Sequence, residues 1–89
     1  MGYRFTLFVN GERADTADEL ARLRQMLDRS LTGGYDLEVI DVMKNPEAAI
    51  ESRVRATPLL IRELPEPVVK VLGSLCSRGV LAAFGIEEG

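Results

Sequence analysis

Residues 35–47 read YDLEVIDVMKNPE, and this stretch decides the fold class. Its first eight residues are rich in β-branched and aliphatic side chains, which predicts a strand over 35–42. The residues expected to supply the core are Leu37, Val39, Ile40 and Val42. Asn45-Pro46-Glu47 then marks a helix start, with Asn45 as the cap, proline at the first helical position and a carboxylate near the positive end of the helix dipole. The pattern predicts a strand followed by a short helix that ends near Arg53.

The segment before this stretch supplies a strand and a long helix. Residues 3–9 alternate apolar and polar side chains, but Phe8 interrupts the polar side, which predicts a strand covered on both faces. Thr16-Ala17-Asp18-Glu19 forms a capping box, and an apolar stripe with helical spacing follows: Leu20, Leu23, Leu27 and Leu31. Gly33-Gly34 ends this helix. A helix between two strands predicts a right-handed βαβ unit with parallel strands.

The last third of the chain supports two interpretations. In the first, Ala56-Thr57-Pro58 leads into a strand over 59–61, a turn over 64–67, a strand over 68–72 and a helix over 73–84 that ends at Gly85. In the second, Pro67 begins a helix and the strand is 80–86 instead. The apolar face of that helix would be Val68, Val71, Leu72 and Leu75. The periodicity does not decide between them. We therefore expect a single domain over 1–89, with a stable βαβα half over 1–55 and a variable region over 56–89.

The composition excludes several function classes. The formal net charge is −3, which argues against a general nucleic-acid surface. The chain has no histidine and one cysteine, Cys76, so it lacks the commonest general base and metal ligand and cannot form an internal disulfide. The N-terminal residues do not form a signal-peptide pattern, and no run approaches the ~18–20 apolar residues that span a bilayer. We expect a cytoplasmic protein that binds neither nucleic acid nor membrane.

The order of elements in the first interpretation is the thioredoxin plan, in which a cis proline often precedes the third strand, here at Thr57-Pro58. The loop over 11–15 holds no sulfur where thioredoxin-like enzymes carry their cysteine pair, so disulfide exchange is not expected there. Glu38 and Asp41 fall on opposite faces of a strand, which argues against an acid/base pair. The glycines over 73–79 lack a P-loop ending. We predict no catalytic, cofactor-binding or metal-binding residues.

Several segments together resemble the KaiB family of clock proteins. They are Leu7-x-Val9-x-Gly11, then Tyr35-x-Leu-x-Val-Ile-Asp-Val-x-Lys-Asn-Pro-Glu, then Ala56-Thr57-Pro58-x-Leu60, then Leu64-Pro65-x-Pro67-Val68 and Gly73-x-Leu75. The resemblance covers nearly the whole chain. It implies a three-layer, thioredoxin-like α/β fold (βαβαββα) and a second fold (βαββααβ) reached by rearrangement of the C-terminal half. The candidates for this fold switch are Pro58, Pro65, Pro67 and Gly73.

The resemblance also implies a function without catalysis. KaiB proteins bind KaiC, a RecA-like ATPase and autokinase, in competition with the sensor domain of a histidine kinase, and they often self-associate as dimers or tetramers. The partner-binding candidates are Arg62, which keeps the cation of a frequent family lysine, Lys70, Gly73 and Ser74, where the family usually has aspartate. We expect a regulator in circadian or stress-related signalling. The alternatives are a thioredoxin-like oxidoreductase that uses Cys76 and a detached sensor domain of a histidine kinase.

Overall fold

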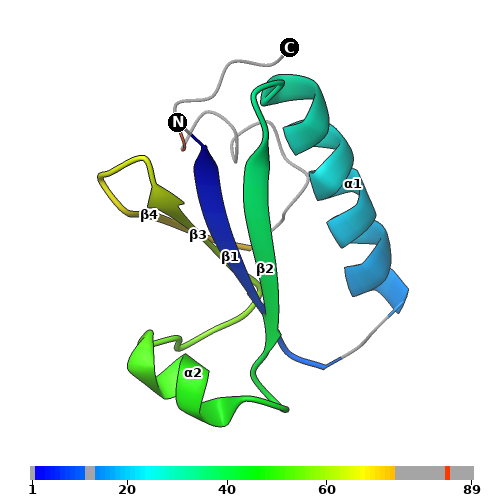
Figure 1. The fold of residues 1–89 in the computed structure, drawn as a ribbon. Helices are drawn as coiled ribbons and strands as arrows, with labels where there is room; N and C mark the ends of the chain where they lie inside the picture. Colours follow the sequence, from blue (N-terminus) through cyan, green and yellow to red (C-terminus); the bar gives the residue numbers. More distant parts are fainter. Residues whose placement is uncertain (1, 12–13, 74–83, 85–89) are drawn as a thin grey trace.

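A computed structural model describes residues 2–11, 14–73 and 84, which form an α/β domain (Figure 1). In chain order the elements are β1 (Tyr3–Val9), α1 (Ala14–Ser30), β2 (Tyr35–Asp41), α2 (Pro46–Glu51), β3 (Leu59–Leu64) and β4 (Val69–Leu72). The strands lie in the order β2-β1-β3-β4. β1 and β2 are parallel, as the βαβ pattern predicted, and β3 is antiparallel to both β1 and β4. Among the described residues, no helix is both long and apolar enough to cross a membrane.

β1 lies at the centre of the sheet and is buried on both faces, as the interruption at Phe8 predicted. On one face its side chains join a core with α1, β3 and Phe84: Phe5, Leu7, Val9, Leu23, Leu27 and Leu60. On the other face Phe8 packs with Leu59 and Ile61, and Ala48 of α2 covers this smaller cluster. Helices therefore cover both faces of the sheet, which gives the three-layer arrangement expected from the sequence.

The ends of α1 differ in how well the sequence predicted them. The helix begins at Ala14. Thr16 therefore lies inside the helix, and the capping box predicted there is wrong. The C-terminal end is confirmed, because Gly34 donates its N–H to the carbonyl of Leu31 and adopts a φ of +95°, a conformation that glycine reaches without steric cost.

β2 and α2 are less buried than the apolar pattern predicted. Val39 was expected in the core but is 37% exposed, because β2 is an edge strand of the described sheet and lacks a neighbour on one side. α2 begins at Pro46 as predicted, but the Asn45 side chain makes no capping hydrogen bond. The helix ends at Glu51, before the predicted end, and Arg53 takes a left-handed φ of 55° just after it.

The C-terminal region follows the first of the two interpretations as far as residue 72. Residues 69–72 form a strand paired with β3, so no helix starts at Pro67 in this structure. The peptide bond at Thr57–Pro58 is cis as expected, and those at Leu64–Pro65 and Glu66–Pro67 are cis as well. The helix predicted over 73–84 and the alternative strand over 80–86 lie outside the described residues, apart from Phe84 and Gly73.

Candidate protein-binding surface

The β3–β4 hairpin gathers most of the residues that the sequence singled out. We call residues 64–72, from the last residue of β3 through the turn to the end of β4, the hairpin edge. The turn and Lys70 are exposed, and the large apolar side chains beside them are exposed as well: Leu64 by 45%, Val68 by 55% and Leu72 by 59%. Leu72 lies on the edge strand and the other two flank the turn, and uncovered aliphatic side chains of this size grouped beside a sheet edge are typical of a protein-binding surface.

Pro58 and Gly73, both predicted as fold-switch candidates, meet at the base of this hairpin. Gly73 donates its N–H to the Pro58 carbonyl at 3.1 Å, which extends the β3–β4 ladder by one pair. Gly73 has a φ of +110°, so a side chain here would be strained. The structure thus places these two candidates together, and Pro65 and Pro67 at the opposite end of the hairpin.

Arg62 does not present its cation at the surface, contrary to the expectation from the sequence. Its exposure is only 8%, because its position in β3 shares the α1-facing side of the sheet with Leu60. One guanidinium nitrogen donates to the carbonyl of Pro67 at 2.9 Å, and another donates to the carbonyl of Phe84. Among the residues that the structure describes, the Nε atom has no hydrogen-bond partner. In this fold Arg62 ties the hairpin turn to residue 84 and is not free to contact a partner directly.

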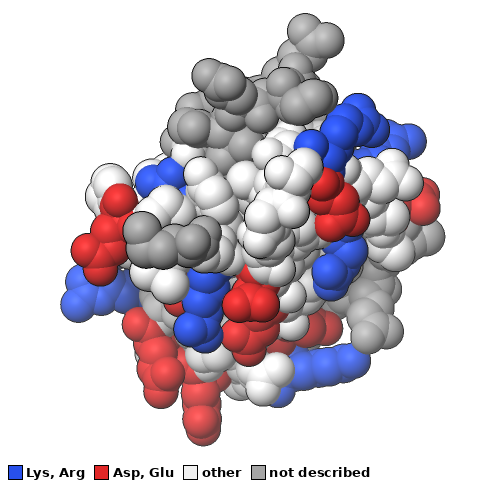
Figure 2. All heavy atoms as spheres, turned by 45° about the horizontal axis from the view of Figure 1, so that its top comes forward, with Lys and Arg blue, Asp and Glu red and all other residues white. Residues whose placement is uncertain are grey.

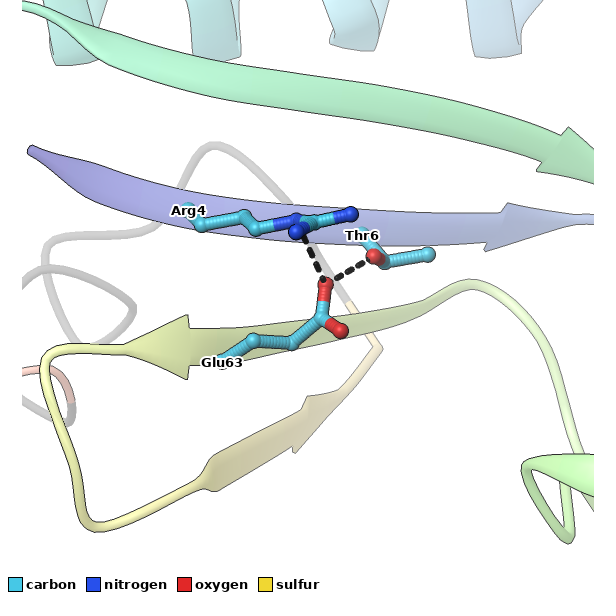
Figure 3. A network of polar contacts seen from close by, with 3 residues as sticks. All are labelled: Arg4, Thr6 and Glu63. Atoms are coloured by element: carbon cyan, nitrogen blue, oxygen red, sulfur yellow. Dashed lines mark hydrogen bonds and ion pairs between the residues drawn. The ribbon is translucent and has the colours of Figure 1, made fainter.

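A polar network that sequence reasoning missed joins β1 to β3 on the other face of the sheet (Figure 3). The Thr6 hydroxyl donates to Oε1 of Glu63, and Nε of Arg4 lies 3.9 Å from the same oxygen. Thr6 is 7% exposed, so its hydroxyl needs this acceptor. The sequence did carry a signal for this network, because Arg4 and Thr6 are polar residues within a strand that was expected to be covered on both faces. The network fixes the hairpin against the centre of the sheet.

Asp41 and Tyr35 hold the two ends of β2. The Asp41 carboxylate accepts hydrogen bonds from the N–H groups of Gly11, at 3.0 Å, and Met43, at 2.9 Å, and these bonds lower its pKa below 3.8. The carboxylate thus binds the backbone of the loops that follow β1 and β2. Burial and the hydrogen bond that the Tyr35 hydroxyl donates to Asp28, at 2.8 Å, raise the pKa of Tyr35 above 10.0. Both groups fasten strand ends to neighbouring elements, which is a structural task.

The remaining sequence-predicted residues are either exposed or not described. Lys70 is exposed on β4, and Glu47, expected near the start of the short helix, is exposed on α2. Ser74 and Cys76 lie outside the described residues. On the face seen in Figure 2, acidic and basic side chains are interspersed around uncharged ones, and the charges do not gather by sign. Among the described residues, the hairpin edge is therefore the surface where exposed aliphatic side chains and the sequence-predicted binding residues occur together.

Fold comparison defines the class first. The structure superposes on the N-terminal domain of Synechococcus elongatus SasA with a TM-score of 0.75, covering 92% of this chain and 79% of that one at 21% identity. It also superposes on chloroplastic thioredoxin z with a TM-score of 0.70, covering 94% and 77% at 14% identity. The fold is thioredoxin-like.

The sequence comparisons give the family. The family model named KaiB domain matches residues 6–84. Proteins named circadian clock oscillator protein KaiB from Trichodesmium erythraeum and Microcystis aeruginosa are each 41% identical over 76 residues, which is 85% of this chain and 73% of theirs. The corresponding protein of Thermosynechococcus vestitus is 40% identical over 85% of this chain and 70% of its own. The chain belongs to the KaiB family.

Proposed function

We propose that this protein is a non-catalytic regulator that binds a KaiC-like RecA-fold ATPase and autokinase and thereby modulates circadian or stress-related signalling in the cytoplasm. The observation that carries the proposal is the 41% identity, over 85% of the chain, to proteins named circadian clock oscillator protein KaiB. The sequence agrees with a role in binding, because it has no histidine and no thiol in the loop over 11–15.

The hairpin edge is the docking surface in this proposal. Its exposed aliphatic side chains and Lys70 supply an apolar contact flanked by a positive charge. Arg62 stabilises the same surface without being exposed on it, since its guanidinium donates to the carbonyl of Pro67 within the turn. Gly73 sets the end of β4, and Ser74 follows it in the chain.

The fold switch belongs to the same proposal, with residues 56–89 as the region that rearranges and 1–55 as the half that stays. The support is the double pattern in the sequence after Ala56, together with the limited attachment of the hairpin to the described remainder of the sheet, which is through β1 alone. We further propose that a histidine kinase competes for the docking surface and that the chain self-associates as a dimer or tetramer in the alternative fold.

Binding to the ATPase is tested by mixing the protein with a KaiC homologue from the same genome and separating the mixture by size exclusion. The runs use ATP, ADP and no nucleotide. We expect co-elution in at least one nucleotide state, and a loss of co-elution for Lys70→Glu. Arg22→Glu, which reverses an exposed charge on α1, is the matched control and should co-elute like the unchanged protein.

Separate elution in every nucleotide state would contradict the proposal. Activity in an insulin-reduction assay that Cys76→Ser abolishes would contradict it independently, because it would make the protein an oxidoreductase.

A further inference from the structure

In the described part of the chain, the outer side of β4 has backbone groups that pair with no other strand, and their positions follow from the ladder. The bond from Gly73 N–H to the Pro58 carbonyl continues the register in which Leu60 opposes Val71 and Arg62 opposes Val69. In antiparallel ladders, hydrogen-bonded pairs alternate with pairs that face away. Val71 and Val69 therefore use their N–H and C=O groups toward β3. The N–H and C=O groups of Lys70 and Leu72 point outward, at the edge of the described sheet.

The side chains of these same two residues lie together on one face. Val69 and Val71 pack against the α1-side core, so Lys70 and Leu72 project to the opposite face, where both are exposed. In the described part of the chain, Lys70 forms no ion pair. Glu63, on the same face of the neighbouring strand, already accepts from Thr6 and lies beside Arg4. The edge thus offers a backbone ladder, one aliphatic side chain and one cation without a carboxylate.

We propose that β4 binds an extended acidic segment of a partner protein as an added strand, with a carboxylate opposite Lys70 and an aliphatic residue opposite Leu72. Strand addition gives affinity through main-chain hydrogen bonds and specificity through alternate side chains. An opposite charge directly across a strand pair is stabilising. We take the partner to be a protein, as in the proposed function, on which this inference rests.

A second copy of the same edge fits less well than an acidic strand. Antiparallel pairing of two β4 strands about Lys70 would put the two ammonium groups directly opposite each other. Pairing about Val71 would put them on the diagonal, within about 7–8 Å. Either register brings together like charges in a strand of only four residues, Val69–Leu72. An acidic strand replaces that repulsion with attraction.

The test uses a capped peptide, Thr-Ile-Thr-Glu-Thr-Ile-Thr, whose sequence reads the same in both directions and so fits a parallel or an antiparallel strand. It is titrated into the ¹⁵N-labelled full chain, and amide shifts are followed by NMR. We expect saturable shifts centred on Lys70 and Leu72. The Lys70→Glu variant should bind this peptide weakly and should gain affinity for the matched peptide with Lys in place of Glu. Arg22→Glu should leave both titrations unchanged.

The backbone contribution is tested separately by Leu72→Pro. The Leu72 N–H points away from β3, so proline removes a donor that the described ladder does not use. We expect binding to weaken about fivefold, the factor that corresponds to one hydrogen bond of ordinary net strength. Leu72→Ala controls for the lost side chain and keeps the N–H, so Leu72→Pro should bind the peptide more weakly than Leu72→Ala.

Three results would overturn the inference. The first is an absence of amide shifts on addition of the peptide, and the second is shifts centred on β2. The third is self-association in sedimentation experiments that Lys70→Glu alters, because a second copy would then occupy the edge. Because no ATPase enters this experiment, its failure alongside intact co-elution with the KaiC homologue would reject only strand addition. Peptide binding without co-elution would instead reject the proposed function.

Discussion

Arg62 puts a permanently charged guanidinium where the described residues offer it carbonyl oxygens only. Its bonds to Pro67 and Phe84 offset part of the desolvation cost and join the hairpin turn to residue 84. Arg62→Met leaves both carbonyls without this donor and should lower the free energy of unfolding by about 2–3 kcal/mol. Arg62→Lys should lose about 1 kcal/mol, because a single ammonium does not span both acceptors as the planar fork does. Urea denaturation measures both values, and an Arg62→Met variant as stable as the parent would show that desolvation outweighs the two bonds.

Asp41 gives the fold a dependence on pH whose direction follows from its lowered pKa. The N–H groups of Gly11 and Met43 stabilise the ionised carboxylate in the folded chain, so the unfolded chain takes up a proton first as the pH falls. The stabilisation is complete above the ordinary pKa of 3.8 and is lost as the pH falls through the lower folded value. Asp41→Asn should therefore be less stable than the parent at pH 7. The difference should shrink as the pH falls below 3.8, in thermal unfolding followed from neutral to acid pH.

Asp36→Asn is the control for this prediction, because Asp36 is an exposed carboxylate of the same strand. At pH 7 its stability should be close to that of the parent. A difference between Asp41→Asn and the parent that stays constant from neutral to acid pH would contradict the assigned role of the two N–H groups.

At the scale of elements, the spacing of hydrophobic residues correctly predicted the features of strands and helices that depend on residues close together in the sequence. The bounds of β1, the face of α1 and the parallel pairing of β2 all follow from residues close in sequence. Val39 and Arg62 could not be predicted in the same way, because their burial depends on which strand lies beside them. The start of β4 was undecided for a related reason. Residues 67–72 fit a strand or a helix equally well by spacing, and pairing with β3 decides the outcome. The Thr6–Glu63 contact joins residues 57 positions apart, beyond the reach of local patterns.

That contact makes a testable contribution to the pairing of β1 with β3. Thr6→Val keeps the shape of the side chain but removes the donor to Glu63, and should cost about 1–2 kcal/mol of unfolding free energy. Glu63→Ala removes the acceptor, and a double-mutant cycle should return a coupling energy of about 1 kcal/mol. Thr32→Val, at an exposed position after α1, should change stability by less than about 0.5 kcal/mol. A cycle with zero coupling would show that the two side chains contribute independently.

At the scale of the whole molecule, the described hairpin is held by one strand pairing, by the guanidinium of Arg62 and by core contacts of Leu60, Val69 and Val71. A rearrangement of residues 56–89 must break the pairing with β1. The proposed second fold therefore predicts two slowly exchanging sets of NMR peaks that include β1 as well as 56–73. The peaks of α1 should separate less, because that helix keeps its own structure while the core side chains of Leu60, Val69 and Val71 packed against it move.

The Arg62 variants test whether the hydrogen bonds of Arg62 influence the equilibrium between the described fold and the proposed second fold. Since 1.4 kcal/mol is a factor of ten, the loss predicted for Arg62→Met should raise the population of the second set at least about tenfold, if the other fold does not use those two bonds. The population of the second set in Arg62→Lys should lie between the populations in Arg62→Met and in the parent. Exchange spectroscopy at several temperatures measures the populations directly. A second set confined to the turn over 65–67, with β1 unaffected, would mean that only the turn changes conformation while the sheet stays intact, and would contradict a fold switch of the whole region.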